Sequence, residues 1–329
     1  MTRNVWVKGK TLSLALAAVL SSFPAWGAVE GSFDRTLNVT GPVELEVRTG
    51  SGSIQVMTGS GGSVRIIGRI KAGWGLFSGT RDAEEAVRRL EQNPPIEQTG
   101  NAIVVGAAKQ PDWLNNISIS YEITAPPETR VRASTGSGSQ VIEGVKGPVE
   151  ARTGSGGIRV ARVVQEVEAR TGSGHIQLEG VGGAVRLETG SGGIRASDLG
   201  SSATAHTGSG SIDLVLKGEG DVEARTGSGG VRVMGVSGGM DASTSSGSIE
   251  VEGKPASLWK LHTSSGGIRV QVPPGSTFDL RARTGSGTIT VDHPVTVQGV
   301  IDRKKIEGKA GAGGPLVELN TSSGSIHIR

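Results

Sequence analysis

The eight letters VEARTGSG occur twice, 18 residues apart, in VEARTGSGGIRVARVVQEVEARTGSGHIQL, residues 149–178. Over the whole chain the pattern T-[GS]-S-G-x-[IV]-x-[VLIA] begins at Thr49, Thr153, Thr171, Thr189, Thr207, Thr226, Thr244, Thr263, Thr284 and Thr321. Weaker copies begin at Thr58 and at Thr135, where Gln140 takes the place of the usual Ile. From Thr135 to Thr284 successive copies are 18 to 21 residues apart. A short, nearly fixed period predicts a solenoid in which each repeat forms one coil.

Each period contains two segments in which apolar and polar residues alternate. One segment precedes the Thr, as in residues 149–153, and the other follows the Gly-Ser-Gly corner, as in residues 158–160. A period of two sends one set of side chains inward from a β-strand and the other set outward. The apolar positions divide the coil into two halves of nine residues, which favours two faces over three. We therefore predict an all-β fold, a parallel β-solenoid of two-strand coils of about 18 residues.

The repeat also predicts details of the coil. We expect glycine at the corners because glycine tolerates positive φ. The recurring Thr has the parity of the inward Ala and Val residues, so we expect an internal ladder of hydroxyls that bond to one another. The outward residue directly after the Ile or Val of the motif differs from copy to copy, and no two successive copies both carry Arg at this position. Like charges repel across neighbouring strands, and this pattern indicates that consecutive copies, including those with Arg269 and Thr290, are adjacent coils.

The chain begins with the features of a signal peptide. Residues 1–27 hold three basic residues, an apolar run at 12–20 and small residues before the expected cleavage after Gly27. The run is too short to span a bilayer, so we expect export without a transmembrane anchor, to the periplasm, the cell envelope or the medium. Removing residues 1–27 leaves 31 basic and 31 acidic residues. This balance gives no reason to expect nucleic acid as a partner.

The repeat is interrupted between residues 72 and 125. Residues 81–92 (RDAEEAVRRLEQ) have the pattern of an amphipathic helix, with Ala83, Val87 and Leu90 on one face. We divide the mature chain into an N-terminal β part, 28–134, whose helix caps or flanks the stack, and regular coils over 135–329.

The interrupted segment also carries the candidate partner contacts. Trp74, Phe77 and Trp113 lie in it, and aromatic residues are favoured at interface hot spots. Open sheet edges invite pairing with another chain, so we also expect end-to-end self-association of the solenoid.

Taken together, these features resemble the exported bacterial "putative adhesin" β-strand-repeat family. The shared features are the signal peptide, the helix-containing N-terminal part and the TGSG-type coils. A Gly-rich insert, here residues 306–315, precedes a final strand, here TSSGSIHIR. The resemblance implies a β-solenoid at the cell envelope and supplies no catalytic residues.

Few residues of the sequence suggest a catalytic, cofactor-binding or metal-binding site. The chain has no cysteine, which excludes thiol catalysis and disulfides. Its Gly-rich turns lead into strands, whereas a phosphate-binding loop leads into a helix, and the five histidines are dispersed. We predict no catalytic, cofactor-binding or metal-binding residues, and a non-enzymatic binding or structural role toward an envelope protein or a glycan. The alternative is a polysaccharide-active enzyme, for which Glu150 with Glu168, or Glu223 with Asp241, would form stacked acid pairs.

Overall fold

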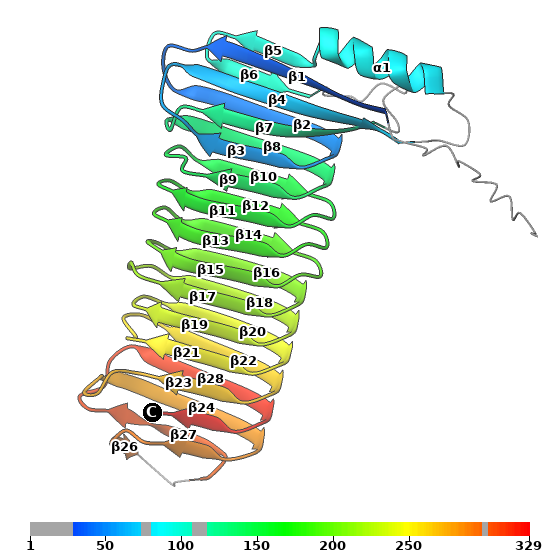
Figure 1. Ribbon diagram of the computed structural model, residues 1–329. Helices are drawn as coiled ribbons and strands as arrows, with labels where there is room; N and C mark the ends of the chain where they lie inside the picture. Colours follow the sequence, from blue (N-terminus) through cyan, green and yellow to red (C-terminus); the bar gives the residue numbers. More distant parts are fainter. Residues whose placement is uncertain (1–28, 74–79, 107–116, 298–301) are drawn as a thin grey trace, which may run out of the picture.

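The computed structural model describes residues 29–73, 80–106, 117–297 and 302–329. Two sheets face each other along an elongated rod (Figure 1), one of 14 strands (sheet A) and one of 15 (sheet B). In spatial order, sheet A comprises β1 (Val29–Asn38), β4 (Ser63–Ala72), β7 (Ile117–Ala125), β3 (Ile54–Thr58), β9 (Gln140–Glu143), β11 (Ile158–Val163), β13 (Ile176–Val181), β15 (Ile194–Leu199), β17 (Ile212–Leu216), β19 (Val231–Val236), β21 (Ile249–Gly253), β23 (Ile268–Gln271), β29 (Ile326–Ile328) and β25 (Ile289–Val291). Sheet B comprises β26 (Val295–Val297), β27 (Lys305–Ala310), β24 (Phe278–Ser286), β28 (Leu316–Ser323), β22 (Trp259–Ser265), β20 (Met240–Ser246), β18 (Val222–Ser228), β16 (Ala203–Ser209), β14 (Val185–Thr189), β12 (Val167–Thr171), β10 (Val149–Thr153), β8 (Thr129–Ser137), β2 (Val43–Ser51), β6 (Ala102–Val105) and β5 (Ile96–Thr99).

The regular coils confirm the predicted parallel β-solenoid. In each coil the strand before the Thr belongs to sheet B, and the strand after the corner belongs to sheet A. Neighbouring coils pair in parallel and in register, so that Thr153 lies opposite Thr171, and Ile158 opposite Ile176. The inward side chains are buried as the alternation predicted, because the period of two puts every second residue between the sheets.

Large and small residues alternate between the two sheets inside the core. Ala169 of sheet B and Leu178 of sheet A belong to one coil, whereas the next coil carries Leu187 and Ala196 at the same positions. All four side chains are buried. These two coils therefore each place one large and one small side chain at this level between the sheets.

This pairing of a large with a small side chain predicts that one substitution destabilises the coil and that a second, compensating substitution restores its stability. Ala169→Leu should lower the free energy of unfolding by about 1–3 kcal/mol, because the coil would then hold two large side chains. Adding Leu178→Ala recreates the arrangement of the next coil and should restore most of the loss. Urea unfolding of the single and double variants measures both effects, and a double variant less stable than the single one would contradict the account.

The recurring Thr side chains point inward as predicted, but the expected hydroxyl-to-hydroxyl ladder is wrong. The hydroxyl of Thr171 donates to the carbonyl oxygen of Gly156 in the preceding coil at 2.8 Å. It accepts the backbone N–H of Gly174 at 3.1 Å. The same link to the preceding coil recurs along the stack, for example from Thr189 and Thr207. Each Thr therefore ties the corner of its own coil to the corner before it.

The reason for glycine at the corner also differs from the prediction. Among the glycines three residues after the Thr, positive φ occurs in the described chain at Gly52, Gly61 and Gly229. At Gly192, which is not one of these, an added Cβ would lie 1.8 Å from the carbonyl oxygen of Gly174 in the preceding coil. The corner needs glycine chiefly because the stacked backbones approach too closely for a side chain.

The coils at the C-terminal end do not follow chain order, which corrects the predicted sequence of neighbours. The outward column runs in chain order as far as Arg269, but His327 of β29 then lies opposite both Arg269 and Thr290. In sheet B, β28 likewise lies between β22 and β24. Figure 1 shows red β28 inserted between yellow and orange coils. The shared motif makes every coil edge similar, so the last copy can fill a place between earlier ones.

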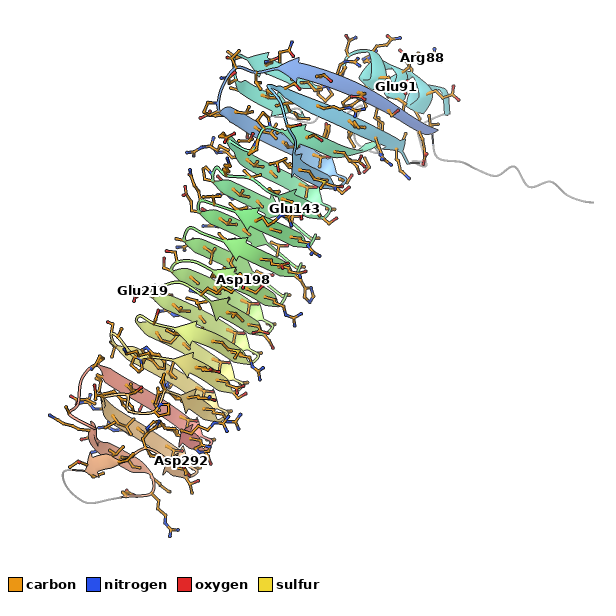
Figure 2. All side chains as sticks on the ribbon, turned by 60° about the vertical axis from the view of Figure 1, so that its left-hand side comes forward. Arg88, Glu91, Glu143, Asp198, Glu219 and Asp292 are labelled. Atoms are coloured by element: carbon orange, nitrogen blue, oxygen red, sulfur yellow. The ribbon has the colours of Figure 1, made fainter. Side chains whose placement is uncertain are left out.

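The N-terminal end is built from non-repetitive elements. Helix α1 (Thr80–Gln92) lies beside β1 at this end of the rod (Figure 1), and β1 and β7 pair with β4 in antiparallel fashion. Val87 and Leu90 are buried, as the amphipathic pattern predicted. Arg88 and Glu91 are labelled on this helix in Figure 2, and the Glu91 carboxylate accepts the backbone N–H of Ser32 at 2.9 Å. Among the described residues no helix has the length and apolar character needed to cross a membrane.

Gln140 is a buried departure from the repeat. It lies between Ile54 and Ile158 in sheet A and is fully buried. Its Nε2 donates to the carbonyl oxygen of Arg152 at 2.6 Å, but its Oε1 has no partner. A buried acceptor without a partner costs free energy.

Replacing this amide with the consensus side chain should stabilise the protein. Gln140→Ile removes the unpaired oxygen, and we expect the free energy of unfolding to rise by about 1 kcal/mol. The control is Gln177→Ile at an exposed outward position, which should change stability by less than about 0.5 kcal/mol. Thermal melting of both variants checks this. A loss of stability in Gln140→Ile would show that the bond to Arg152 outweighs the unpaired oxygen.

Candidate binding surface

The aromatic residues predicted as partner contacts lie outside the described residues. Trp74 and Phe77 fall within 74–79, and Trp113 falls within 107–116. The candidate surface therefore comes from the coils themselves.

An axial groove runs along the edge of sheet B where its strands reach the Gly-Ser-Gly corners. It has a volume of about 870 Å³ and is lined from Ser134 to Gly227 by residues of six successive coils. Its floor is a column of glycines, and the outward residues before the Thr stand along it. The glycines are Gly154, Gly172, Gly190, Gly208 and Gly227, and the outward residues are Arg152, Arg170, Glu188, His206 and Arg225.

One position of the motif changes at the C-terminal end of the groove. The residue directly after the Thr is Gly in the coils from Thr135 to Thr226, but it is Ser in the next two coils, as Ser245 and Ser264. The lining stops at Gly227, immediately before the coil with Ser245. A missing side chain opens space along the stack, and its return closes that space. The difference between TGSG and TSSG is visible in the sequence, but sequence reasoning treated the two as equivalent.

The charged residues along the groove form two runs of ion pairs, of which the first begins at the N-terminal side. Arg152 pairs with Glu150 in its own strand and with Glu168 in the next coil at 3.2 Å. Arg170 continues this run between Glu168 at 2.9 Å and Glu188 at 3.5 Å. These side chains are 29–52 % exposed, so each pair contributes little to stability. The run instead arranges charges of both signs at intervals of one coil.

The second run of ion pairs lies farther along the groove and includes a histidine. His206 contacts the carboxylate of Glu223 at 2.9 Å, and Arg225 contacts Glu223 at 2.9 Å and Asp241 at 3.0 Å. Among the described residues, no three side chains of the types that bind metals come together.

The acid pairs considered for polysaccharide cleavage are stacked in adjacent coils. Glu150 lies opposite Glu168, and Glu223 lies opposite Asp241. Each of these four carboxylates contacts an arginine. The structure therefore places all four carboxylates in ion pairs with outward arginines.

Three other carboxyl groups on the rod have lowered pKa values because they are hydrogen-bonded to cationic side chains. Hydrogen bonding to Arg65 lowers the pKa of Asp34, and hydrogen bonding to Lys146 lowers the pKa of Glu128. Hydrogen bonds from Arg283 and Lys305 lower the pKa of Glu307. These three outward carboxyl groups are shifted in the direction opposite to that required of a general acid.

Comparison with known proteins relates the last third of the chain to a described family. The family model Toastrack DUF4097 matches residues 221–329. No curated protein has a significantly similar sequence.

The solved structures that match this chain include three from bacteria. One is described as a "putative cell adhesion protein" from Clostridium sporogenes, with 12 % identity, a TM-score of 0.21, and coverage of 91 % of this chain and 99 % of its own. A "putative adhesin" from Bacteroides fragilis has 12 % identity and a TM-score of 0.32, with coverage of 91 % and 97 %. Another "putative adhesin", from Parabacteroides distasonis, has 11 % identity and a TM-score of 0.31, with the same coverage.

Proposed function

We propose that this protein is an exported, non-catalytic binding rod of the cell envelope, and that its axial groove holds a linear glycan. The observation that carries this proposal is the groove itself, which extends over six coils and is lined by polar side chains at every coil. A repeated row of similar polar positions suits a ligand that is itself a repeating chain.

The chemistry of the groove favours a glycan over other polymers. Neighbouring coils are spaced by about 4.8 Å, which is close to the advance of one pyranose unit along a linear chain. Glycine in the floor lets a flat sugar ring approach the backbone, and Arg, Glu and His beside it can bond to sugar hydroxyls. Nucleic acid binding depends on cations that neutralise phosphates, and Arg152, Arg170 and Arg225 already have carboxylate partners.

Export is the second part of the proposal. It is supported by the signal-like sequence of residues 1–27, and the first described strand begins at Val29, just beyond the expected cleavage after Gly27. Cleavage there would leave β1 whole. Expression in a bacterium followed by N-terminal sequencing of the exported protein should give Ala28 as the first residue. Recovery of only the full-length chain in the cytoplasm would contradict export.

The groove can be filled with a side chain that this solenoid already tolerates at the same position. In the variant Gly172→Ser, Gly190→Ser, Gly208→Ser, the floor acquires the residue found at Ser245 and Ser264. The matched control is Gly157→Ser, Gly193→Ser, at a position outside the groove where another coil carries Ser211. An added Cβ at these three glycines lies 2.5–2.6 Å from a backbone carbonyl oxygen of the preceding coil, so the coils must adjust to the serines. Circular dichroism and thermal melting therefore test first whether both variants are folded.

Binding is then measured by co-sedimentation with purified bacterial cell-wall glycan, whose chain length is determined before and after incubation. We expect the parent and the control to bind equally and the floor variant to bind about tenfold more weakly, a loss of about 1.4 kcal/mol. Equal binding by all three proteins, or binding by none, would refute the groove as a glycan site. Shortening of the glycan by the parent would refute the non-catalytic role and support the polysaccharide-active alternative.

A further inference from the structure

Positive charge is concentrated on β24, β27 and residues 302–304, at the end of the rod opposite α1 (Figure 1). Together they carry six cationic residues and three acidic ones, whereas residues 28–329 as a whole carry 31 of each. The six cationic side chains, which we call the basic face, are all exposed and belong to Arg281, Arg283, Arg303, Lys304, Lys305 and Lys309. The inward side chains of β24, such as Phe278 and Leu280, are buried, so Arg281 and Arg283 stand on the outer side of sheet B.

Three cations of the basic face share a single carboxylate. One oxygen of Glu307 in β27 lies 3.0 Å from Arg283, 3.4 Å from Lys305 and 3.9 Å from Arg281. In the described part of the chain these three cations form no other ion pair. In the axial groove, by contrast, Arg152 alone has two carboxylate partners. The basic face therefore keeps positive charge that its own carboxylates do not compensate.

The remaining acids beside the basic face are bonded to neutral donors. Asp279 lies opposite Lys309, but its carboxylate accepts the backbone N–H of Gly314 at 3.4 Å. Glu318 of β28 lies opposite Arg281, but its carboxylate accepts the side-chain amide of Asn320 at 3.2 Å. Within the described ranges neither acid forms an ion pair. Acceptor oxygens thus remain available between the cations.

The spacing and mixture of these groups indicate the kind of ligand. Arg281 and Arg283 are two residues apart in one strand, about 7 Å, and the neighbouring strand β27 is about 4.8 Å away. These intervals suit a linear chain that bears one charge on each sugar. Cationic side chains bind carboxylates strongly, as Glu307 illustrates, and Asp279 and Glu318 can accept hydrogen bonds from sugar hydroxyls. The backbone of DNA carries closely spaced phosphates and offers no donor to these two acids.

We propose that the basic face is a second binding surface of this protein, and that it binds an acidic polysaccharide whose sugars carry carboxylate groups. The surface is separate from the axial groove, whose lining ends at Gly227, so it does not depend on the function proposed for the groove. Arg281 and Arg283 are 46 % and 54 % exposed. Salt screens exposed charges, so binding should weaken as ionic strength rises.

A labelled acidic oligosaccharide can test this surface. The probe is a linear oligomer of galacturonic acid with a fluorescent end label, and the control ligand is the same oligomer with its carboxyl groups reduced to alcohols. The face variant is Arg281→Gln, Arg283→Gln. Its matched control is Arg232→Gln, Arg269→Gln, which removes two outward arginines of similar exposure that share Glu250 in sheet A. Thermal melting shows whether both variants are folded, and fluorescence anisotropy at low ionic strength measures binding.

We expect the parent and the control variant to bind the acidic oligomer equally, and the face variant to bind it about tenfold more weakly. The variant Arg281→Lys, Arg283→Lys keeps the charge and should retain most of the binding. The floor variant of the axial groove should bind this probe as the parent does, which separates this test from that of the proposed function.

Three results would overturn the proposal. The first is a parent that does not bind the acidic oligomer, or that binds the reduced oligomer equally well. The second is a face variant that binds like the parent, with or without a loss in the floor variant. The third is tighter binding of the parent to duplex DNA with the same number of charges, which would make the basic face a phosphate-binding surface instead.

Discussion

Gly192→Val should lower the free energy of unfolding by about 3 kcal/mol, the upper part of the usual range for overpacking. The new Cβ would lie 1.8 Å from the carbonyl oxygen of Gly174, which is backbone and cannot rotate away. The neighbouring coils must separate at this corner, which weakens the bond from the Thr207 hydroxyl to the Gly192 carbonyl. Urea unfolding followed by circular dichroism measures the loss.

The adjacent residue provides the control for this prediction. Gly193→Ser adds a side chain at a position where the next coil has Ser211 and the preceding coil has His175. An added Cβ there meets its nearest atom at an ordinary contact distance of 3.5 Å. We expect its stability to remain within about 0.5 kcal/mol of the parent. If the two variants unfolded at the same urea concentration, close stacking of the backbones would not be the reason for glycine at the corner.

The second large effect is expected at the N-terminal end. The double variant Val87→Asp, Leu90→Asp places two carboxylates where α1 buries its apolar face. The helix should undock, and the loss of two buried side chains corresponds to about 3–5 kcal/mol. Gly31 of β1 would then be uncovered, because Val87 and Glu91 pack directly over it.

Undocking should also change the association state, because an open sheet end invites pairing with another chain. Light scattering should show self-association of the double variant, while circular dichroism retains the β-signal of the coils. Arg88→Asp changes an exposed residue of the same helix and should remain monomeric with nearly unchanged stability. A double variant as stable and as monomeric as this control would show that α1 does not protect the end of the stack.

The coil itself could be predicted from the sequence because its determinants are local and repeated. Alternation within residues 149–153 and 158–160 settles which side chains point inward, and the period of 18 residues places each coil on the one before it. The helix was predictable for the same reason, since the spacing of Val87 and Leu90 is a property of a short segment. For residues 80–92 the prediction and the structure differ by a single position at the start.

The order of coils at the ends was decided only by the tertiary structure. Thr284 follows Thr263 in the sequence, but Thr321 lies between them in space. The motif at all three positions is nearly the same, so local sequence cannot distinguish which copy sits beside which. The position of the last coil depends on the path of the chain through β26 and β27. These two strands lie between β25 and β28 in the sequence, and β27 pairs with β24.

The contacts between coils likewise exist only in the assembled stack. Sequence reasoning recognised that the corner requires Gly and that the Thr faces inward. The carbonyl groups that exclude a side chain at Gly192 and accept the hydroxyl of Thr171 belong to a neighbouring coil. The axial groove also depends on several coils together, since one glycine after a Thr is an ordinary corner residue, whereas five in a column line a groove. Local alternation determined the coil, whereas contacts between stacked coils determined the order, the corner chemistry and the candidate site.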